Sequence, residues 1–66
     1  MPRNDAEAFK MCRDYQESKG YTGLTQGEVE FILGDRPCRN FIMACGPNVT
    51  STRAGGDMIY SFRYRR

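Results

Sequence analysis

Histidine is absent from this chain, and no apolar run approaches the roughly 20 residues that a membrane-spanning helix needs. Without histidine, the three cysteines, Cys12, Cys38 and Cys45, have no partner to complete a Cys/His zinc site. The chain also has no glycine-rich phosphate loop of the expected spacing and no nucleophile with an evident neighbouring base. These absences predict that the protein is not an enzyme, uses no cofactor and does not enter a membrane.

The cysteine content favours an intracellular protein. An odd number of cysteines does not make a secreted disulfide framework, and no signal peptide is visible. Cys38 and Cys45 would lie about two turns apart on one helix, which is too far for a local disulfide. We expect three small buried residues in a cytoplasmic protein (the host cytoplasm if the chain is viral), and a redox or metal role is the alternative.

The charges are distributed unevenly along a chain of 66 residues, which has room for one domain spanning residues 1–66. Residues 1–33 carry four Lys or Arg and six Asp or Glu, whereas residues 34–66 carry six arginines and two aspartates. Arginine forms forked contacts with phosphate and guanine and is enriched at protein interfaces. The basic second half therefore predicts either a polyanion or an acidic protein surface as the partner.

Capping and periodicity signals predict a first helix near the start of the chain. Asn4 or Asp5 can cap it, and Gly20 can end it. The i, i+3, i+4, i+7 spacing of apolar residues predicts its buried stripe. The stripe comprises Ala8, Met11, Cys12 and Tyr15, with Phe9 on its flank.

The clearest local signals lie after this helix and predict a second one over residues 26–33. Thr25 and Glu28 have the spacing of a capping box, and Leu24 and Val29 have that of a hydrophobic staple. Gly34 can take the left-handed conformation that ends a helix.

A third helix is predicted over residues 36–45, with Pro37 in its first turn. Its apolar stripe consists of Cys38, Phe41, Ile42 and Cys45. The opposite side carries Arg36, Arg39, Asn40 and Met43. Arginine and asparagine are the residues that read guanine and adenine edges in the major groove. Contact with bases or phosphates is the preferred hypothesis, and plain solvation or contact with a protein are the alternatives.

A β-hairpin is predicted at the end of the chain. β-Branched and aromatic runs at 49–53 and 58–64 flank the turn sequence Ala-Gly-Gly-Asp. Alternation assigns one face to the helices and the other to the outside. The first face holds Met58, Tyr60, Phe62 and Tyr64, and the second holds Ile59, Ser61, Arg63 and Arg65. The predicted fold class is α+β, mostly α, with three short helices followed by a C-terminal β-hairpin.

Three helices followed by a hairpin resemble the winged helix-turn-helix family, as in small phage or plasmid DNA-binding proteins. The resemblance implies that helix 36–45 enters the major groove and that hairpin 49–64 acts as the wing. By position, Arg36, Arg39, Asn40 and Met43 would face the bases, and Arg53, Arg63, Arg65 and Arg66 would contact phosphates. The implied function is a transcription regulator or an excision-type architectural factor that binds DNA as a homodimer or in an array.

The alternative function is a small inhibitor that docks on a host nucleic-acid-processing protein. Anti-CRISPR and polymerase-inhibiting phage proteins are similar in size to this chain. Exposed positions predicted for Met43 and Ile59, together with the acidic first half, favour this alternative. The first wing strand is also nearly uncharged, because its centre is Thr50, Ser51 and Thr52.

Overall fold

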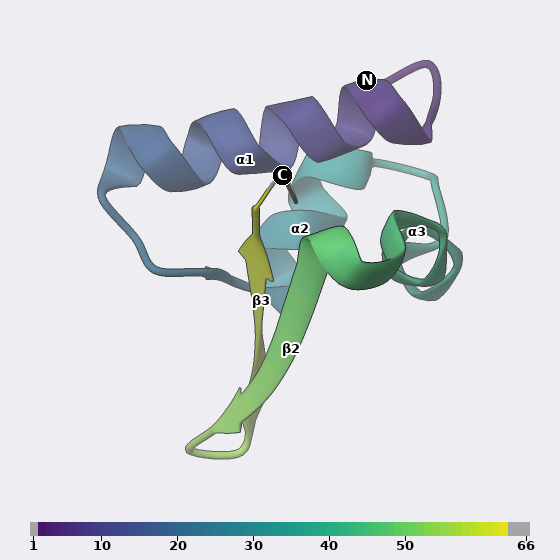
Figure 1. Cartoon of the computed structure of the whole chain (residues 1–66). Coiled ribbons are helices and arrows are strands. Elements are labelled where there is room, and N and C mark those ends of the chain that lie inside the picture. The colour runs from purple at the N-terminus through teal and green to yellow at the C-terminus, as the bar shows by residue number, and fades with distance from the viewer. Residues whose placement is uncertain (1, 64–66) are drawn as a thin grey trace.

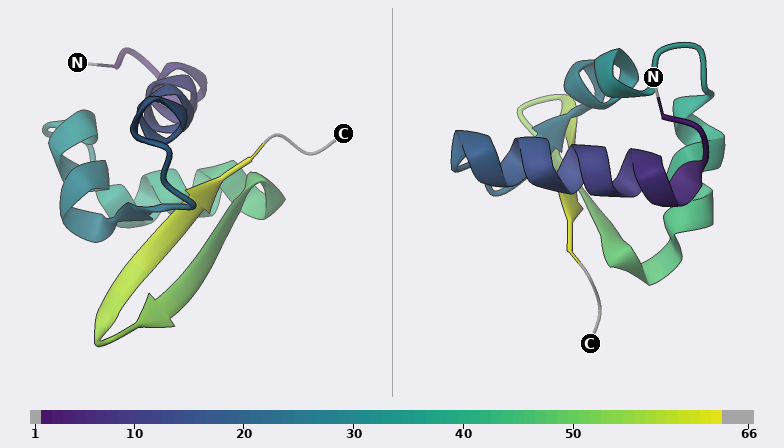
Figure 2. Two further views of the ribbon diagram at one scale, coloured as in Figure 1. Left: turned by 90° about the vertical axis from the view of Figure 1, so that its left-hand side faces the viewer. Right: turned by 90° about the horizontal axis from the view of Figure 1, so that it is seen from above.

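The computed structural model describes residues 2–63, so the predictions for Tyr64, Arg65 and Arg66 lie outside the described residues. The elements are α1 (Asp5–Lys19), β1 (Leu24–Thr25), α2 (Gln26–Leu33), α3 (Cys38–Cys45), the 3-10 turn η1 (Gly46–Asn48), β2 (Val49–Ala54) and β3 (Asp57–Phe62). The helices gather at one end, and the β2–β3 hairpin projects away from them (Figures 1 and 2). The predicted class, mostly helical α+β with three helices before a hairpin, is confirmed. None of the helices in this part of the chain is long and apolar enough to cross a bilayer.

The sheet contains a third strand that the sequence did not predict. Leu24 and Thr25 pair antiparallel with Tyr60 and Ile59, so that the strand order is β1-β3-β2 and β3 is central. A strand of two residues is too short to show the alternation by which strands are recognised. The same two residues also carry the staple and cap signals that predict α2, and these helix signals hide the strand.

The connector before β1 runs close to β3 and covers part of it. A Cβ atom added at Gly23 would lie 2.6 Å from Ile59 Cγ2 and 3.1 Å from the Tyr60 carbonyl oxygen. Glycine is therefore required at this position for steric reasons. Ile59 is half-buried beside this connector, and so the prediction that it is exposed on the outer face is wrong.

Side-chain caps fix the starts of the first two helices as predicted. The Glu7 backbone N–H donates to Asn4 Oδ1 at 2.8 Å. At α2, the Glu28 N–H donates to Thr25 Oγ1 at 3.2 Å, and the Thr25 N–H donates to Glu28 Oε1 at 2.9 Å, which completes the capping box. Each bond satisfies a backbone donor that the first helical turn leaves without a partner.

Glycines end these two helices, and proline delays the third. Gly20 is left-handed, while Gly34 has a positive φ of 65° but a ψ of −116°, outside the left-handed helical well. Pro37 is extended and is the N-cap of α3, so this helix begins at Cys38, two residues later than predicted. A residue before proline is kept out of the helical region by the proline ring, which excludes Arg36 from the helix.

Phe62, the last residue of β3, lies at the centre of the core. Its ring meets that of Phe9 edge-on at 5.8 Å and stacks on that of Phe41 at 6.1 Å. One strand end thus joins α1 to α3. The other large side chains that are fully buried in the described part of the chain are Leu24, Leu33, Val29 and Cys12.

The buried stripe of α1 differs from the predicted one by about one residue. Met11 is 36% exposed, so its assignment to the stripe is wrong, while Phe9 is buried rather than flanking. Tyr15 is only partly buried, and the polar Gln16 is buried instead.

Gln16 is buried because it completes the sheet. The Phe62 backbone N–H donates to Gln16 Oε1 at 2.9 Å, and Gln16 Nε2 donates to the Phe62 carbonyl at 3.5 Å. β1 pairs with β3 only at Tyr60 and Ile59, so no strand residue faces Phe62 on that edge. A buried backbone group without a partner is costly, and this side chain stands in for the missing strand.

We therefore expect Gln16→Leu to destabilise the fold by about 1–3 kcal/mol, because it leaves the buried Phe62 N–H and carbonyl without partners. Urea unfolding followed by circular dichroism measures the change. The same substitution at the exposed Gln26, whose amide bonds only Glu30, is the matched control and should change stability by about 0.5 kcal/mol or less. Equal losses in the two variants would contradict the role given to Gln16.

Candidate nucleic-acid interface

The two faces of α3 differ as the sequence predicted. Phe41 is buried, and the other members of its apolar stripe, Cys38, Ile42 and Cys45, pack against the core. On the opposite face Arg39, Asn40 and Met43 are exposed, and Met43 has 73% of its surface accessible. These three side chains are available to a partner.

A groove of about 410 Å³ lies between α3 and the hairpin. Arg39 and Met43 line it from α3, Ser51 and Tyr60 line it from the two hairpin strands, and Gln26 lines it from α2. A second groove, of about 520 Å³, shares Gln26 and extends to Arg53 and Met58. We call the two together the α3–hairpin trough, formed chiefly by Gln26, Arg39, Met43, Ser51, Arg53 and Tyr60. It has an arginine towards each end.

Strand register explains how the hairpin contributes to the trough. Gly55 and Gly56 both have positive φ, of 58° and 91°, as a two-residue type I′ turn requires. This turn pairs Ser51 with Tyr60 and Arg53 with Met58, and residues two apart on a strand share a face. The face is buried at its helical end, where Phe62 lies, and opens towards the tip.

The electrostatic character of the trough changes along its length. Arg39 is the charged residue of the first groove. In the second groove Arg53 is accompanied by Glu30 and Asp57. The carboxylates lower the attraction of the Arg53 end for a polyanion, so the stronger positive field lies beside α3.

Arg36 does not join the exposed face of α3. It lies in the turn before the helix, and its Nη2 donates to Asp5 Oδ1 at 2.5 Å. Its side chain is half-buried, and its Nε is buried with no hydrogen-bond partner. The predicted assignment of Arg36 to the third helix is therefore wrong, and in this structure the residue ties the α2–α3 turn to the start of α1.

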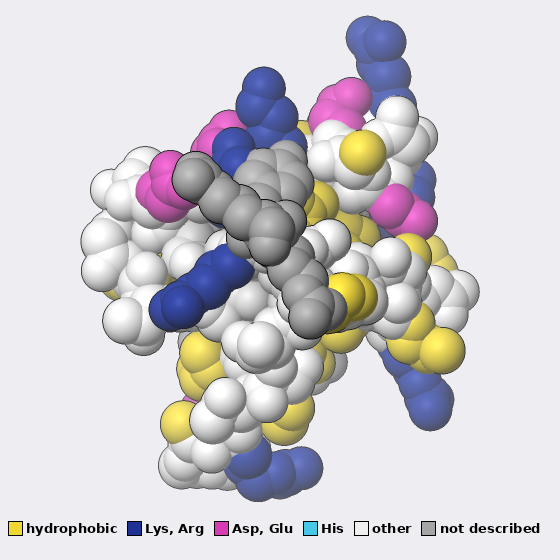
Figure 3. All heavy atoms as spheres, viewed as in Figure 1, with side chains coloured by type: hydrophobic (Ala, Val, Ile, Leu, Met, Phe, Trp, Pro, Cys, Tyr) yellow, Lys and Arg dark blue, Asp and Glu magenta, His cyan; other side chains and the backbone are white. Residues whose placement is uncertain are grey.

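Arg63, the remaining predicted cation among the described residues, does not line the trough. Arg63 is exposed just after β3, where its backbone N–H donates to the Asn48 carbonyl at 2.9 Å. On the face shown in Figure 3 the Lys and Arg side chains project separately, one of them near the hairpin tip, and form no continuous patch. Residues 65 and 66 lie outside the described part of the chain.

Three trough residues were not among the predicted site residues. Ser51 and Tyr60 were detectable in principle, because counting back from the Gly-Gly turn places them opposite each other and on the face of Arg53. Gln26 carries no such signal. It belongs to the trough because α2 and the hairpin approach each other in the folded chain.

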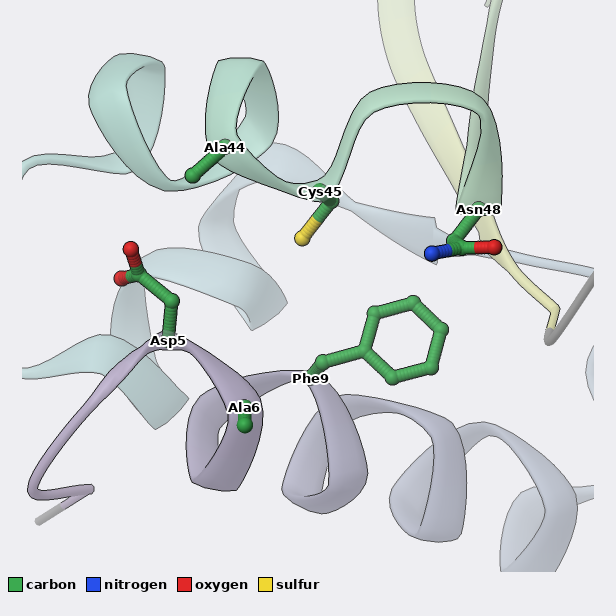
Figure 4. Close-up of a pocket in the computed structure, with 6 residues that line it drawn as sticks. All are labelled: Asp5, Ala6, Phe9, Ala44, Cys45 and Asn48. Atoms are coloured by element: carbon green, nitrogen blue, oxygen red, sulfur yellow. The ribbon is translucent and has the colours of Figure 1, made fainter.

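A smaller pocket, of about 280 Å³, lies between α1 and α3 (Figure 4). The Cys45 thiol and the Asp5 carboxylate point into it, and the Phe9 ring lies along its wall. Burial, with a smaller contribution from Asp5, raises the pKa of Cys45 to about 11. A thiol protonated at neutral pH is a poor nucleophile.

Cys12 and Cys38 are also free thiols, and burial is the main cause that raises the pKa of each, to about 12 for Cys12. Cys12 is fully buried, as predicted, whereas Cys38 and Cys45 are half-buried against the core. No group of three or more His, Cys, Asp or Glu side chains among residues 2–63 is arranged to hold a metal ion.

The raised pKa of Cys12 predicts a loss of stability at alkaline pH. Above the ordinary thiol pKa of 9.0 the unfolded chain ionises while the folded chain keeps its proton. The free energy of unfolding should therefore be unaffected by this thiol below pH 9.0 and fall by about 1.4 kcal/mol per pH unit as the pH rises towards 12. Denaturant unfolding measured at several pH values gives the slope. Cys12→Ala should have a shallower slope, and identical slopes would contradict the prediction.

Three helices followed by a β-hairpin are compatible with the winged helix-turn-helix fold. In comparisons of this chain with protein-family models, with curated proteins and with solved structures, no match was found.

Proposed function

We propose that this chain is a small DNA-binding protein of the winged helix-turn-helix type, a transcription regulator or an excision-type architectural factor. In this proposal α3 enters the major groove and the β2–β3 hairpin lies along the backbone as the wing. The observation that carries the proposal is the α3–hairpin trough, where an exposed helix face and an exposed hairpin meet with an arginine towards each end.

The dimensions and side chains of α3 suit the major groove. Its 8 residues form about two turns, and an α-helix with its side chains is about 10–12 Å across, close to the width of the groove. Arg39 can fork onto a guanine, and Asn40 can pair with an adenine edge. Met43 supplies the apolar contact that a thymine methyl group accepts.

The composition of the wing suits contacts with the DNA backbone that make the binding affinity depend only weakly on salt concentration. Thr50, Ser51 and Thr52 are exposed along β2, and hydroxyl groups donate to phosphate oxygens without releasing counterions. Among the predicted contact residues that the structure describes, the cations available for phosphates are Arg39, Arg53 and Arg63, since Arg36 is paired with Asp5. With about three phosphates neutralised, the slope of log K against log salt concentration should be near −3.

The proposal predicts that Arg39→Ala weakens DNA binding. If Arg39 contacts a phosphate, the salt slope should become shallower by about 0.9, and if it reads a base, the preference at that base should relax at a cost of about 1–3 kcal/mol. Fluorescence anisotropy with a pool of random duplexes, from about 50 mM salt upwards, measures affinity and slope together.

Lys10→Ala is the matched control for this experiment. Lys10 is an exposed cation on α1, outside the trough, so its removal changes the net charge by the same amount. It should leave both affinity and slope nearly unchanged. Equal effects of the two variants, or the absence of any binding by the wild-type protein at about 50 mM salt, would overturn the proposal.

A second candidate function is inhibition of a host nucleic-acid-processing protein, and the exposure of Met43 favours it. Met43 is 73% exposed and shares its groove with the partly buried Ile42 and Tyr60. Methionine, tyrosine and arginine together are typical of protein interface cores. Under this candidate, a nuclease-treated host lysate should yield one specific protein that Met43→Glu no longer captures.

A further inference from the structure

The outward face of α2 carries a large apolar side chain that the fold leaves uncovered. Phe31 is 89% exposed, the highest value among the exposed large hydrophobic residues of the described chain. On this helix Val29 and Leu33 are buried, and Phe31 points away from both, as the helical period dictates. Burying such a phenyl ring contributes about 2 kcal/mol or more of stabilising free energy, and the monomer does not gain this stabilisation.

The same face carries a glycine that the monomer does not need. Gly27 lies one turn before Phe31 and has no positive φ. A Cβ atom added there would meet only Thr25 Oγ1, at 4.0 Å, an ordinary contact. Glycine within a helix costs up to about 1 kcal/mol relative to alanine. Neither backbone conformation nor crowding within the chain accounts for this glycine.

A groove of about 350 Å³ lies beside these two residues. It is lined by Gly27 and Phe31 themselves and by Tyr15, Thr25, Glu28 and Ile32. The face thus presents a projecting ring next to a recess of apolar character. A surface that carries both parts of a contact is self-complementary, as an interface between two identical copies related by a two-fold axis must be.

The charges around the groove are complementary in the same sense. The Lys19 ammonium lies on the α1 side, 5.5 Å from the Tyr15 ring centroid. Residues 26–33 of α2 carry two carboxylates, Glu28 and Glu30, and no cation. A two-fold contact brings Lys19 of each copy towards the acidic α2 helix of the other, so the same attraction between opposite charges occurs twice in the dimer.

We propose that two copies of this chain form an isologous dimer through this face, with Phe31 of each copy seated in the groove of the other over its Gly27. The surface of one copy is 4669 Å², and a standard interface takes about 800 Å² of it. A single aromatic anchor per copy on so small a protein gives a weak dimer, with a dissociation constant in the micromolar range. The dimer uses none of the six residues that chiefly form the α3–hairpin trough, although Thr25 and Gly27 also line the second groove of the trough. It does not depend on DNA binding.

Sedimentation equilibrium of the full chain, without DNA, tests the proposal. The wild-type protein should change from monomer to dimer as its concentration rises to about 0.5 mM. Phe31→Ala should raise the dissociation constant at least about tenfold while the circular dichroism spectrum stays native, because the removed ring is exposed in the monomer.

Gly27→Ala separates the interface from the fold. The substitution should leave the monomer as stable as before or more stable, since alanine is the better helix former and the position has room. It should nevertheless weaken the dimer, because the methyl group occupies the space above Gly27 that the partner's phenyl ring fills. A purely structural glycine would give the opposite result, a less stable monomer.

Met43→Ala is the matched control for non-specific association. Met43 is the other highly exposed apolar residue, on α3 and outside this face. Its replacement should leave the dissociation constant unchanged. A wild-type protein that stays monomeric at about 0.5 mM, or a Phe31→Ala variant that associates as the wild type does, would overturn the proposal.

Discussion

The pairing of Phe62 with Gln16 is the contact on which the other elements of this fold depend. Phe62 ends the central strand, its ring joins α1 to α3, and its backbone groups have no strand partner on one edge. Because Gln16 accepts from its N–H and donates to its carbonyl, the strand can be buried at that point without orphaned polar groups. The position of the strand then sets the position of the hairpin. The hairpin in turn forms one wall of the α3–hairpin trough.

The elements that the sequence predicts well are those whose signals are local. The capping box of Thr25 and Glu28, the glycine stops and the Gly-Gly turn each act through atoms a few residues apart, and all appear in the structure. The missed features depend on contacts between distant segments. Gln16 is buried because of Phe62, and the strand at residues 24–25 exists because Tyr60 and Ile59 lie beside it. Single-sequence periodicity contains no information about such partners.

The candidate site divides in the same way. The exposed face of α3 follows from helical periodicity, so Arg39, Asn40 and Met43 were predictable. The loss of Arg36 from that face has two causes. Pro37 delays the helix by a local effect, but the ion pair with Asp5 joins residues 31 positions apart. The two carboxylates that accompany Arg53 likewise come from other elements, Glu30 from α2 and Asp57 from the paired strand β3. Net charge along the sequence therefore overstates how positive the trough is.

The short connection between α3 and β2 has a consequence for the kind of partner that the trough can accept. Only the three residues of η1 separate the helix from the strand, and β2 is paired along its whole length with β3, whose end is held in the core. The helix and the hairpin are thus mounted as one stiff unit, and the span from Arg39 to Arg53 cannot adjust much to a ligand. Under the proposed function, DNA whose phosphates are spaced differently would have to deform to engage both ends. The protein would then discriminate by the deformability of the DNA as well as by its charge.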